Sequence, residues 1–323
     1  MNLPDSVKQD LLCPICKAAL QADEDNSLRC TSPDCATSYP VVDGCPILIN
    51  ESNSVFTIDT YKRREVTTMD LRETPAKKMG IGQKARRWVS AHIPPITRSV
   101  SDFSSTDALN EMAAELKDPP RVLVVGAGEA QMQAESQAQL IYSDVASGPL
   151  THLICDAHDI PFPGEYFDGV IACSVLEHVA DPYRCVEEIF RVLKPKGFVY
   201  AVTPFMQQVH MGRYDFTRFT HLGHRRLFRR FSEKRSGVSN AQGTVMAWSI
   251  ERFFSGFSDD LTSYSRIRTL ARFVGFPFLF FDKMLSRKRA AYDAASAYYF
   301  FGRKSDRTLT DREIIESYRG IHQ

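Results

Sequence analysis

The sequence predicts an α/β fold with a doubly wound parallel sheet, and three observations carry this prediction. Apolar runs typical of parallel strands buried on both faces recur through residues 121–203. The first run, 121–125, leads directly into a Gly126-Ala-Gly128 turn, where glycine permits backbone angles that other residues avoid. Strands and crossovers alternate after it, an order that builds a parallel sheet with its ligand at the carboxyl ends of the strands.

The expected strands follow one another at 121–125, 140–144, 152–157, 166–173 and 198–203. The second ends in Asp144 and the third in Asp156. A carboxylate placed like Asp144 after a glycine turn can accept both ribose hydroxyls of a nucleotide.

A helix is expected to begin at Asp181-Pro182, because Asp is a favoured cap and Pro suits the first turn. Its buried face carries apolar residues at helical spacing, and Pro195-Lys-Gly197 ends it. The apolar residues are Val186, Ile189, Phe190 and Leu193.

Four motifs of this region together resemble the class I S-adenosylmethionine-dependent methyltransferases, and the small-molecule branch in particular. They are Asp156-Ala-His-Asp-Ile-Pro-Phe, Phe167-Asp168, Val175-Leu-Glu-His178-Val and Arg191-Val-Leu-Lys-Pro-Lys-Gly197. The resemblance covers about 121–240. It implies a seven-stranded Rossmann-like sheet of order 3-2-1-4-5-7-6 whose seventh strand is antiparallel.

The same resemblance implies a set of cofactor contacts for S-adenosyl-L-methionine. Gly126 and Gly128 would line the methionine moiety, Asp144 the ribose, Asp156 and Ala157 the adenine, and Ser174 would flank the sulfonium. Val124 and Ala130 depart from the family, which usually has an acid and a glycine there. A dinucleotide-binding dehydrogenase shares the turn, but Gln131 occupies the third-glycine position of its fingerprint.

Four cysteines near the N-terminus have the spacing of a structural zinc site. Cys13, Cys16, Cys30 and Cys35 form C-x2-C-x13-C-x4-C, and two such pairs can surround Zn²⁺ tetrahedrally. Unligated or disulfide-bonded cysteines are the alternative. The sequel, 38–49, resembles the end of the small Trm112-like zinc-ribbon domains, with Cys45 as a core residue and not a fifth ligand.

The chain divides into three expected parts. A zinc ribbon at 1–50 precedes a linker with N-terminal helices at 51–118, of which two are expected at about 76–92 and 105–117. The methyltransferase domain at 119–323 carries a helical insert at about 243–295. Its sixth strand is expected at 233–239, and 297–304 looks like the antiparallel last strand of the family.

The segment that follows the fifth strand gathers residues that can deprotonate a hydroxyl or hold an anion. His210 and His221 are the candidate general bases, and Arg213, Tyr214 and Arg218 are the candidate substrate contacts. The alternative is that these residues support the helix that Thr220 begins.

The insert has an apolar centre with cationic flanks over 266–289. It forms either a lid over the acceptor pocket or a homodimer contact, or it lies in a membrane interface where the basic flanks meet anionic lipid. No stretch approaches the 18 apolar residues of a span, and the N-terminus lacks a signal pattern. We therefore expect a cytoplasmic protein, with peripheral contact at the inner face of the membrane under the second interpretation.

These observations predict methyl transfer to an oxygen or nitrogen of a small molecule, with a glycan or lipid precursor as candidate acceptor. An RNA methyltransferase is an alternative, because residues 61–98 hold ten Lys/Arg against three acids. The absence of an Asn/Asp-Pro-Pro-aromatic motif disfavours nucleic acid. A non-catalytic scaffold is the second alternative, prompted by Val124 and Ala130.

Overall fold

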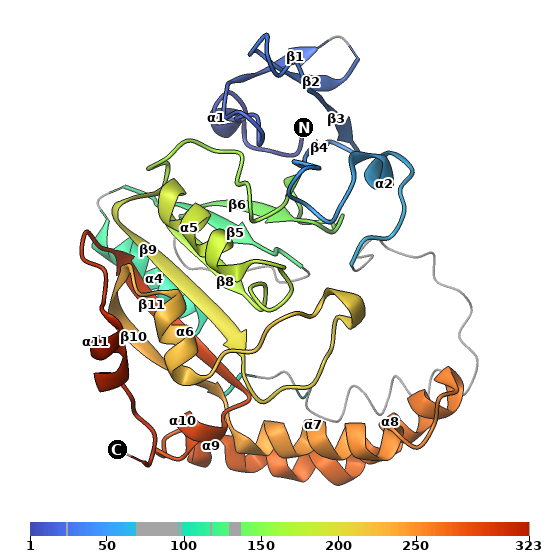
Figure 1. Ribbon diagram of the computed structural model, residues 1–323, viewed down its shortest axis with the longest axis vertical. Helices are drawn as coiled ribbons and strands as arrows, with labels where there is room; N and C mark the ends of the chain where they lie inside the picture. The colour runs from blue at the N-terminus through green and yellow to red at the C-terminus, as the bar shows by residue number, and fades with distance from the viewer. Residues whose placement is uncertain (24, 69–95, 97–98, 117, 129–136, 323) are drawn as a thin grey trace.

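One continuous twisted sheet organises the molecule (Figure 1). The computed structural model describes residues 1–23, 25–68, 96, 99–116, 118–128 and 137–322. The predicted helix at 76–92, Ala130 and Gln131 lie outside the described residues. The strands of the large domain are β5 (Arg121–Val125), β6 (Gln139–Asp144), β7 (Leu153–Cys155), β8 (Phe167–Cys173), β9 (Leu193–Pro204), β10 (Phe231–Asn240) and β11 (Ala297–Lys304).

The strand order confirms the predicted topology. The strands lie in the order β7-β6-β5-β8-β9-β11-β10, which is 3-2-1-4-5-7-6 when they are numbered within this domain. The last strand, β11, is antiparallel to both β9 and β10. β9 starts five residues earlier than the predicted 198, because Leu193 already pairs with Phe167 before a register shift.

The N-terminal unit, residues 1–50, continues the same sheet. It contains α1 (Asp5–Lys8), β1 (Leu20–Asp23), β2 (Ser27–Cys30), β3 (Ser38–Val42) and β4 (Cys45–Leu48). β4 pairs in parallel with β7, and Ile47 lies opposite Ile154. Backbone hydrogen bonding therefore joins the unit to the edge of the large domain.

Helices cover both faces of the central strands, as the alternation of side chains along a strand requires. α5 (Pro182–Val192) packs on the face that carries Val170 and Ala172 of β8. α4 (Ser105–Glu115) packs on the opposite face with Ile171. Caps begin these helices as their sequences predict: Asp181 accepts from the N–H of Arg184 at 3.1 Å, and Ser104 and Asp107 form a capping box.

The insert before β11 is helical, as predicted. It consists of α7 (Gln242–Ser255), α8 (Leu261–Gly275), the 3-10 helix η2 (Phe276–Phe281), α9 (Asp282–Leu285) and α10 (Ala291–Ala294). α7 and α8 pack against each other along the lower edge of the view in Figure 1. The remaining short helices are α2 (Ile58–Lys62), η1 (Gly212–Tyr214), α6 (His221–Leu227) and α11 (Asp311–Glu316). Among the described residues, no helix has both the length and the apolarity to cross a membrane.

Candidate active site

A cavity of about 380 Å³ opens at the carboxyl ends of β5, β6, β7 and β8. This is the edge at which a doubly wound sheet binds its ligand. The cavity is lined by every residue that was predicted to contact the cofactor: Gly126, Gly128, Asp144, Asp156, Ala157 and Ser174.

The glycine turn after β5 is held in a conformation that favours glycine. Gly126 has φ +68° and Gly128 has φ +50°. A Cβ on Gly126 would lie 2.3 Å from Cγ2 of Val175. The Asp144 carboxylate accepts hydrogen bonds from the N–H groups of Gly128 at 2.8 Å and of Ala146 at 2.9 Å. Burial raises the pKa of Asp144, although these N–H groups favour the charged form.

The second acid, Asp156, is tied to two neighbours. Its Oδ1 accepts from the ring Nδ1 of His158 at 2.5 Å, and its Oδ2 accepts from the Ser54 hydroxyl at 2.6 Å. Burial alone would raise the pKa of Asp156, but the hydrogen bond and positive charge of His158 lower it. The carboxylate is therefore ionised. Its Oδ1 also accepts from the backbone N–H of His158 at 3.0 Å, so the lone pair that remains for a ligand is on Oδ2.

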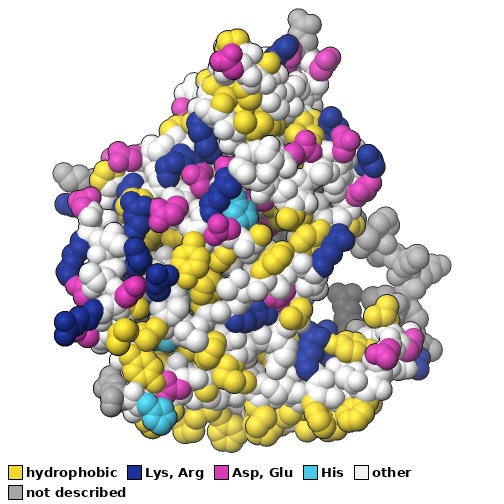
Figure 2. Space-filling model, in the orientation of Figure 1, with side chains coloured by type: hydrophobic (Ala, Val, Ile, Leu, Met, Phe, Trp, Pro, Cys, Tyr) yellow, Lys and Arg dark blue, Asp and Glu magenta, His cyan; other side chains and the backbone are white. Residues whose placement is uncertain are grey.

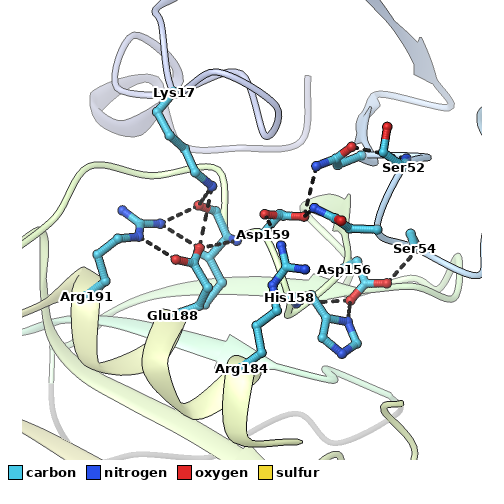
Figure 3. A network of polar contacts seen from close by, with 12 residues as sticks. Lys17, Ser52, Ser54, Asp156, His158, Asp159, Arg184, Glu188 and Arg191 are labelled. Carbon is cyan, nitrogen blue, oxygen red and sulfur yellow. Dashed lines mark hydrogen bonds and ion pairs between the residues drawn. The ribbon is translucent and has the colours of Figure 1, made fainter. Parts of the chain in front are cut away.

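The segment that connects β4 to α2 forms one wall of the cavity, although the sequence predicted it as a linker. Asn53, Val55 and Phe56 line the cavity. Figure 3 shows how the segment is attached: Ser54 reaches Asp156, and the amides of Asn50 and Asn53 donate to Asp159 at 3.1 Å each. The segment that follows the N-terminal unit thus contributes directly to the site.

A second contact attaches the N-terminal unit below this wall. Lys17 approaches the carbonyl of Ile160 and the carboxylate of Glu188, each at 3.5 Å (Figure 3). Arg191 donates to both oxygens of Glu188, at 2.7 and 2.9 Å. These bonds place the motif residues 156–162 between the unit and α5.

The opposite wall comes from the loops after β8 and β9. Ser174 has φ +55°, a conformation that is uncommon for a residue other than glycine and that clusters at functional sites. His178, His210 and Trp248 line the cavity beside it. Behind them lies Glu177, which is 1% exposed. Burial raises the pKa of Glu177 to about 8, and burial lowers the pKa of His178 to about 4.

The structure separates the two histidines that were predicted as bases. His210 lines the cavity, and its ring lies 4.7 Å from the ring of His178. His221 is not among the lining residues: it is buried between Tyr292 and Tyr298, with ring centroids at 4.8 and 5.7 Å. Its position is that of a residue supporting α6, the alternative that the sequence left open.

The three predicted substrate contacts lie behind the cavity wall and not in it. Arg218 donates to the buried carboxylate of Asp215 and to the carbonyls of Gln207 and Gln208, so it organises its own loop. Tyr214 stacks on Phe56 at 5.4 Å. Arg213 is exposed and covers the Tyr214 ring at 4.9 Å. The Arg218 guanidinium therefore already has carboxylate and carbonyl partners within the protein.

The lining residues that the sequence analysis did not name as site residues are chiefly Asn53, His158, His178 and Trp248. His158 and His178 stood inside the quoted motifs, so a motif signal was present for both. Asn53 and Trp248 lie far in the sequence from these motifs, and no local pattern identifies either of them as a site residue.

The four predicted cysteine ligands come together in the N-terminal unit. The Sγ atoms lie 3.7 Å apart between Cys13 and Cys35 and 3.4 Å apart between Cys16 and Cys30, and all four lie within 4.8 Å of one another. Zinc at about 2.3 Å from four tetrahedral sulfurs sets them about 3.8 Å apart, so the group fits this ion. Cys45 lies outside the group, and its thiol donates to the carbonyl of Thr151 at 2.9 Å.

The strand order and this cavity define the class I methyltransferase fold. Residues 110–201 match the family described as "Methyltransferase domain". It is similar to demethylmenaquinone methyltransferase of Symbiobacterium thermophilum, at 30% identity over 38% of this chain and 47% of that protein. It is also similar to O-methyltransferase resE of Aspergillus sclerotiorum, at 30% identity over 30% of this chain and 37% of that protein.

Among solved structures, phosphoethanolamine N-methyltransferase 2 of Haemonchus contortus with S-adenosyl-L-methionine has a TM-score of 0.38 and 16% identity. That likeness covers 70% of this chain and 57% of the other. The chain spans less than half the length of the two curated relatives named above.

Proposed function

We propose that this protein transfers the methyl group of S-adenosylmethionine to an oxygen or nitrogen of a small-molecule acceptor. The observation that carries the proposal is the cavity at the carboxyl ends of β5–β8, with Asp144 bonded to the glycine turn at its centre. The bound cofactor supplies an electrophilic methyl group on its sulfonium. The Asp144 carboxylate would accept hydrogen bonds from the ribose hydroxyls, and the Asp156 carboxylate would accept one from the adenine amino group.

His210 is the residue that we assign to the acceptor. It lines the cavity, and its side chain comes from the loop after β9, on the same side as Ser174. Burial lowers the pKa of His210, so the ring is neutral at pH 7 and has a nitrogen lone pair. Positioning of the acceptor beside the methyl group supplies much of the rate in such a transfer.

A lipid is the acceptor class that the surface favours over a glycan. The insert carries a band of exposed apolar side chains along the lower edge of the molecule in Figure 2. The band consists of Phe253, Phe254, Phe257, Leu261, Leu270, Phe273, Val274, Phe280, Phe281 and Met284. Trp248 of α7, the helix that begins the band, lines the cavity. We infer that the apolar band contacts the membrane interface and delivers the acceptor from there.

The cysteine group of the N-terminal unit is proposed to hold a structural Zn²⁺. Four thiolates close the coordination sphere, so the ion would stabilise the unit and take no part in transfer. Its position supports the wall residues Asn53 and Ser54 through β4.

The proposal is tested with labelled methyl groups. The protein is incubated with methyl-labelled S-adenosylmethionine in three separate reactions. The first contains a lipid extract, the second a water-soluble glycan fraction and the third total RNA. We expect label in the lipid fraction and at least a tenfold loss with His210→Ala. Label in RNA would instead support the RNA methyltransferase. Label in none of them, from protein that binds the cofactor, would support the scaffold.

A further inference from the structure

Three ligand-type side chains meet at the wall of the cavity. Glu177 and His178 follow β8, and His210 follows β9. The Oε1 atom of Glu177 lies 3.6 Å from Nε2 of His178 and 3.9 Å from Nε2 of His210. One ligand atom from each residue lies within 4.8 Å of the other two.

The hydrogen bonds of the two rings direct their free lone pairs toward Glu177. Nδ1 of His178 lies 2.8 Å from the carbonyl oxygen of Tyr214, and Nδ1 of His210 lies 3.3 Å from that of Gln208. A carbonyl oxygen only accepts, so Nδ1 carries the proton in both rings. Nε2 is then an unprotonated acceptor in each neutral ring. A backbone carbonyl behind the distal nitrogen is the usual support of a metal-binding histidine.

One oxygen of the carboxyl group that these rings face lacks a hydrogen-bond partner. Glu177 is 1% exposed, and its Oε2 has no hydrogen-bond partner. An unpartnered buried carboxylate oxygen is costly. Three ligand-type atoms therefore converge, and a cation that displaces the proton of Glu177 satisfies all three.

We propose that Glu177, His178 and His210 bind a divalent transition-metal ion. Two imidazoles and one carboxylate are a ligand set for zinc, iron or manganese that leaves coordination positions open. Ligands at about 2.1 Å from such an ion lie about 3.0–3.4 Å apart, so the two separations of 3.6 and 3.9 Å from Glu177 would shorten by about 0.2–0.9 Å on binding. This site is separate from the four cysteines, which select zinc through sulfur.

The ion would lie at the cavity, since His178 and His210 both line it together with Ser174. This inference rests on the proposed function and redefines the role of His210 as a ligand. An acceptor hydroxyl that coordinates the ion has a lowered pKa and loses its proton to water. The oxygen then forms a bond to the methyl carbon while the carbon–sulfur bond breaks. The electron pair stays on sulfur, giving S-adenosylhomocysteine, so the acceptor is a hydroxyl compound.

The test is a Co²⁺ titration of the full chain with its cysteine site filled by zinc, followed by visible absorption. We expect one Co²⁺ per chain with the spectrum of nitrogen and oxygen ligands and no thiolate charge-transfer band. The isosteric Glu177→Gln and His210→Asn should each weaken binding at least about tenfold. The exposed His322→Gln is the matched control and should leave binding unchanged.

A parallel titration with S-adenosylhomocysteine, and a thermal unfolding curve for each variant, separate this inference from the proposed function. Co²⁺ binding without cofactor binding would leave the metal site standing and remove the methyltransferase. Cofactor binding in folded protein with no Co²⁺ spectrum, or with a thiolate spectrum alone, would overturn the metal site. Binding that survives both substitutions in folded protein would overturn it equally.

Discussion

The carboxylate of Asp144 accepts a hydrogen bond from the backbone N–H of Gly128 at 2.8 Å. This bond joins the end of β6 to the turn that follows β5, so the acid shapes the glycine turn as well as facing the cavity. The two features that the sequence singled out as separate cofactor contacts are therefore one structural unit.

The first prediction concerns the glycine turn. Gly126→Ala combines a left-handed backbone with a Cβ that would lie 2.3 Å from Val175, whereas among the described residues the nearest atom to a Cβ on Gly128 is 4.0 Å away. We expect Gly128→Ala to lower the free energy of unfolding by about 1–2 kcal/mol, from the backbone alone. Gly126→Ala should cost about 1–3 kcal/mol more, from overpacking.

Urea denaturation of the two variants and the parent measures the difference. Val175→Ala in the Gly126→Ala background relieves the contact but not the backbone strain, and should recover part of the loss. Equal destabilisation by the two alanine variants would show that the close approach to Val175 has no energetic consequence.

The second prediction concerns the stability of the folded protein at acidic pH. Burial lowers the pKa of His224 to about 3 and, with nearby arginines, that of His221 to about 4, against an ordinary value of 6.5. Below about pH 6.5 these two histidines are therefore protonated in the unfolded chain but stay neutral in the folded protein. The folded state loses stability as pH falls. The contribution is complete above pH 6.5 and falls by about 1 kcal/mol per pH unit for each histidine down to about pH 4.

Urea denaturation at pH 7 and pH 5 tests this, with His224→Gln beside the parent. The loss of stability between the two pH values should be smaller in the variant, because one of the histidines that resist protonation in the folded state is gone. An identical loss in both proteins would mean that His224 does not resist protonation in the fold.

The third prediction concerns the cysteine group. A mercurial reagent that titrates thiolates should release one zinc ion per chain, and Cys16→Ser should abolish the release. Since metal binding supplies folding energy to such small units, the variant should also lower cofactor affinity through the wall residues of 50–57. Full cofactor affinity in zinc-free protein would show that this wall holds its shape without the metal.

The fourth prediction concerns the apolar band of the insert. Phe280→Asp replaces a side chain that is 70% exposed, and Ile315→Asp, at 66% exposure on α11, is the matched control. In flotation with vesicles containing anionic lipid, we expect the parent and Ile315→Asp to float and Phe280→Asp to float several-fold less. If all three float equally, or none floats, the band is a lid or a contact between copies.

Local patterns were sufficient for most of the fold. Asp181 and Thr220 both cap the helices they were predicted to begin, because a cap depends on residues within one turn. The order of the strands followed from the resemblance, and β11 spans the predicted 297–304. The pairing of Ile47 with Ile154 had no such signal, since it joins residues that are far apart in the sequence.

The site residues at the ends of strands could be predicted from the sequence, whereas the contacts of the site residues in loops could not. Asp144 ends β6 and Asp156 directly follows β7, so the sheet alone brings them together. The contacts of Arg218 and Glu177, in contrast, depend on the path of the loop between β9 and α6. That path turns Arg218 toward Asp215 and leaves Glu177 facing two histidines, which residue type and spacing do not reveal.

Calorimetric titration of S-adenosylhomocysteine into the purified full chain measures whether the cavity at the strand ends binds the cofactor product. We expect a dissociation constant on the order of micromolar and at least a tenfold loss of affinity, about 1.4 kcal/mol, with Asp144→Ala. Asp59→Ala, a change on α2 away from the cavity lining, should leave the affinity unchanged. Folded protein that does not bind S-adenosylhomocysteine, or that binds it equally well without Asp144, would show that this cavity is not a cofactor site.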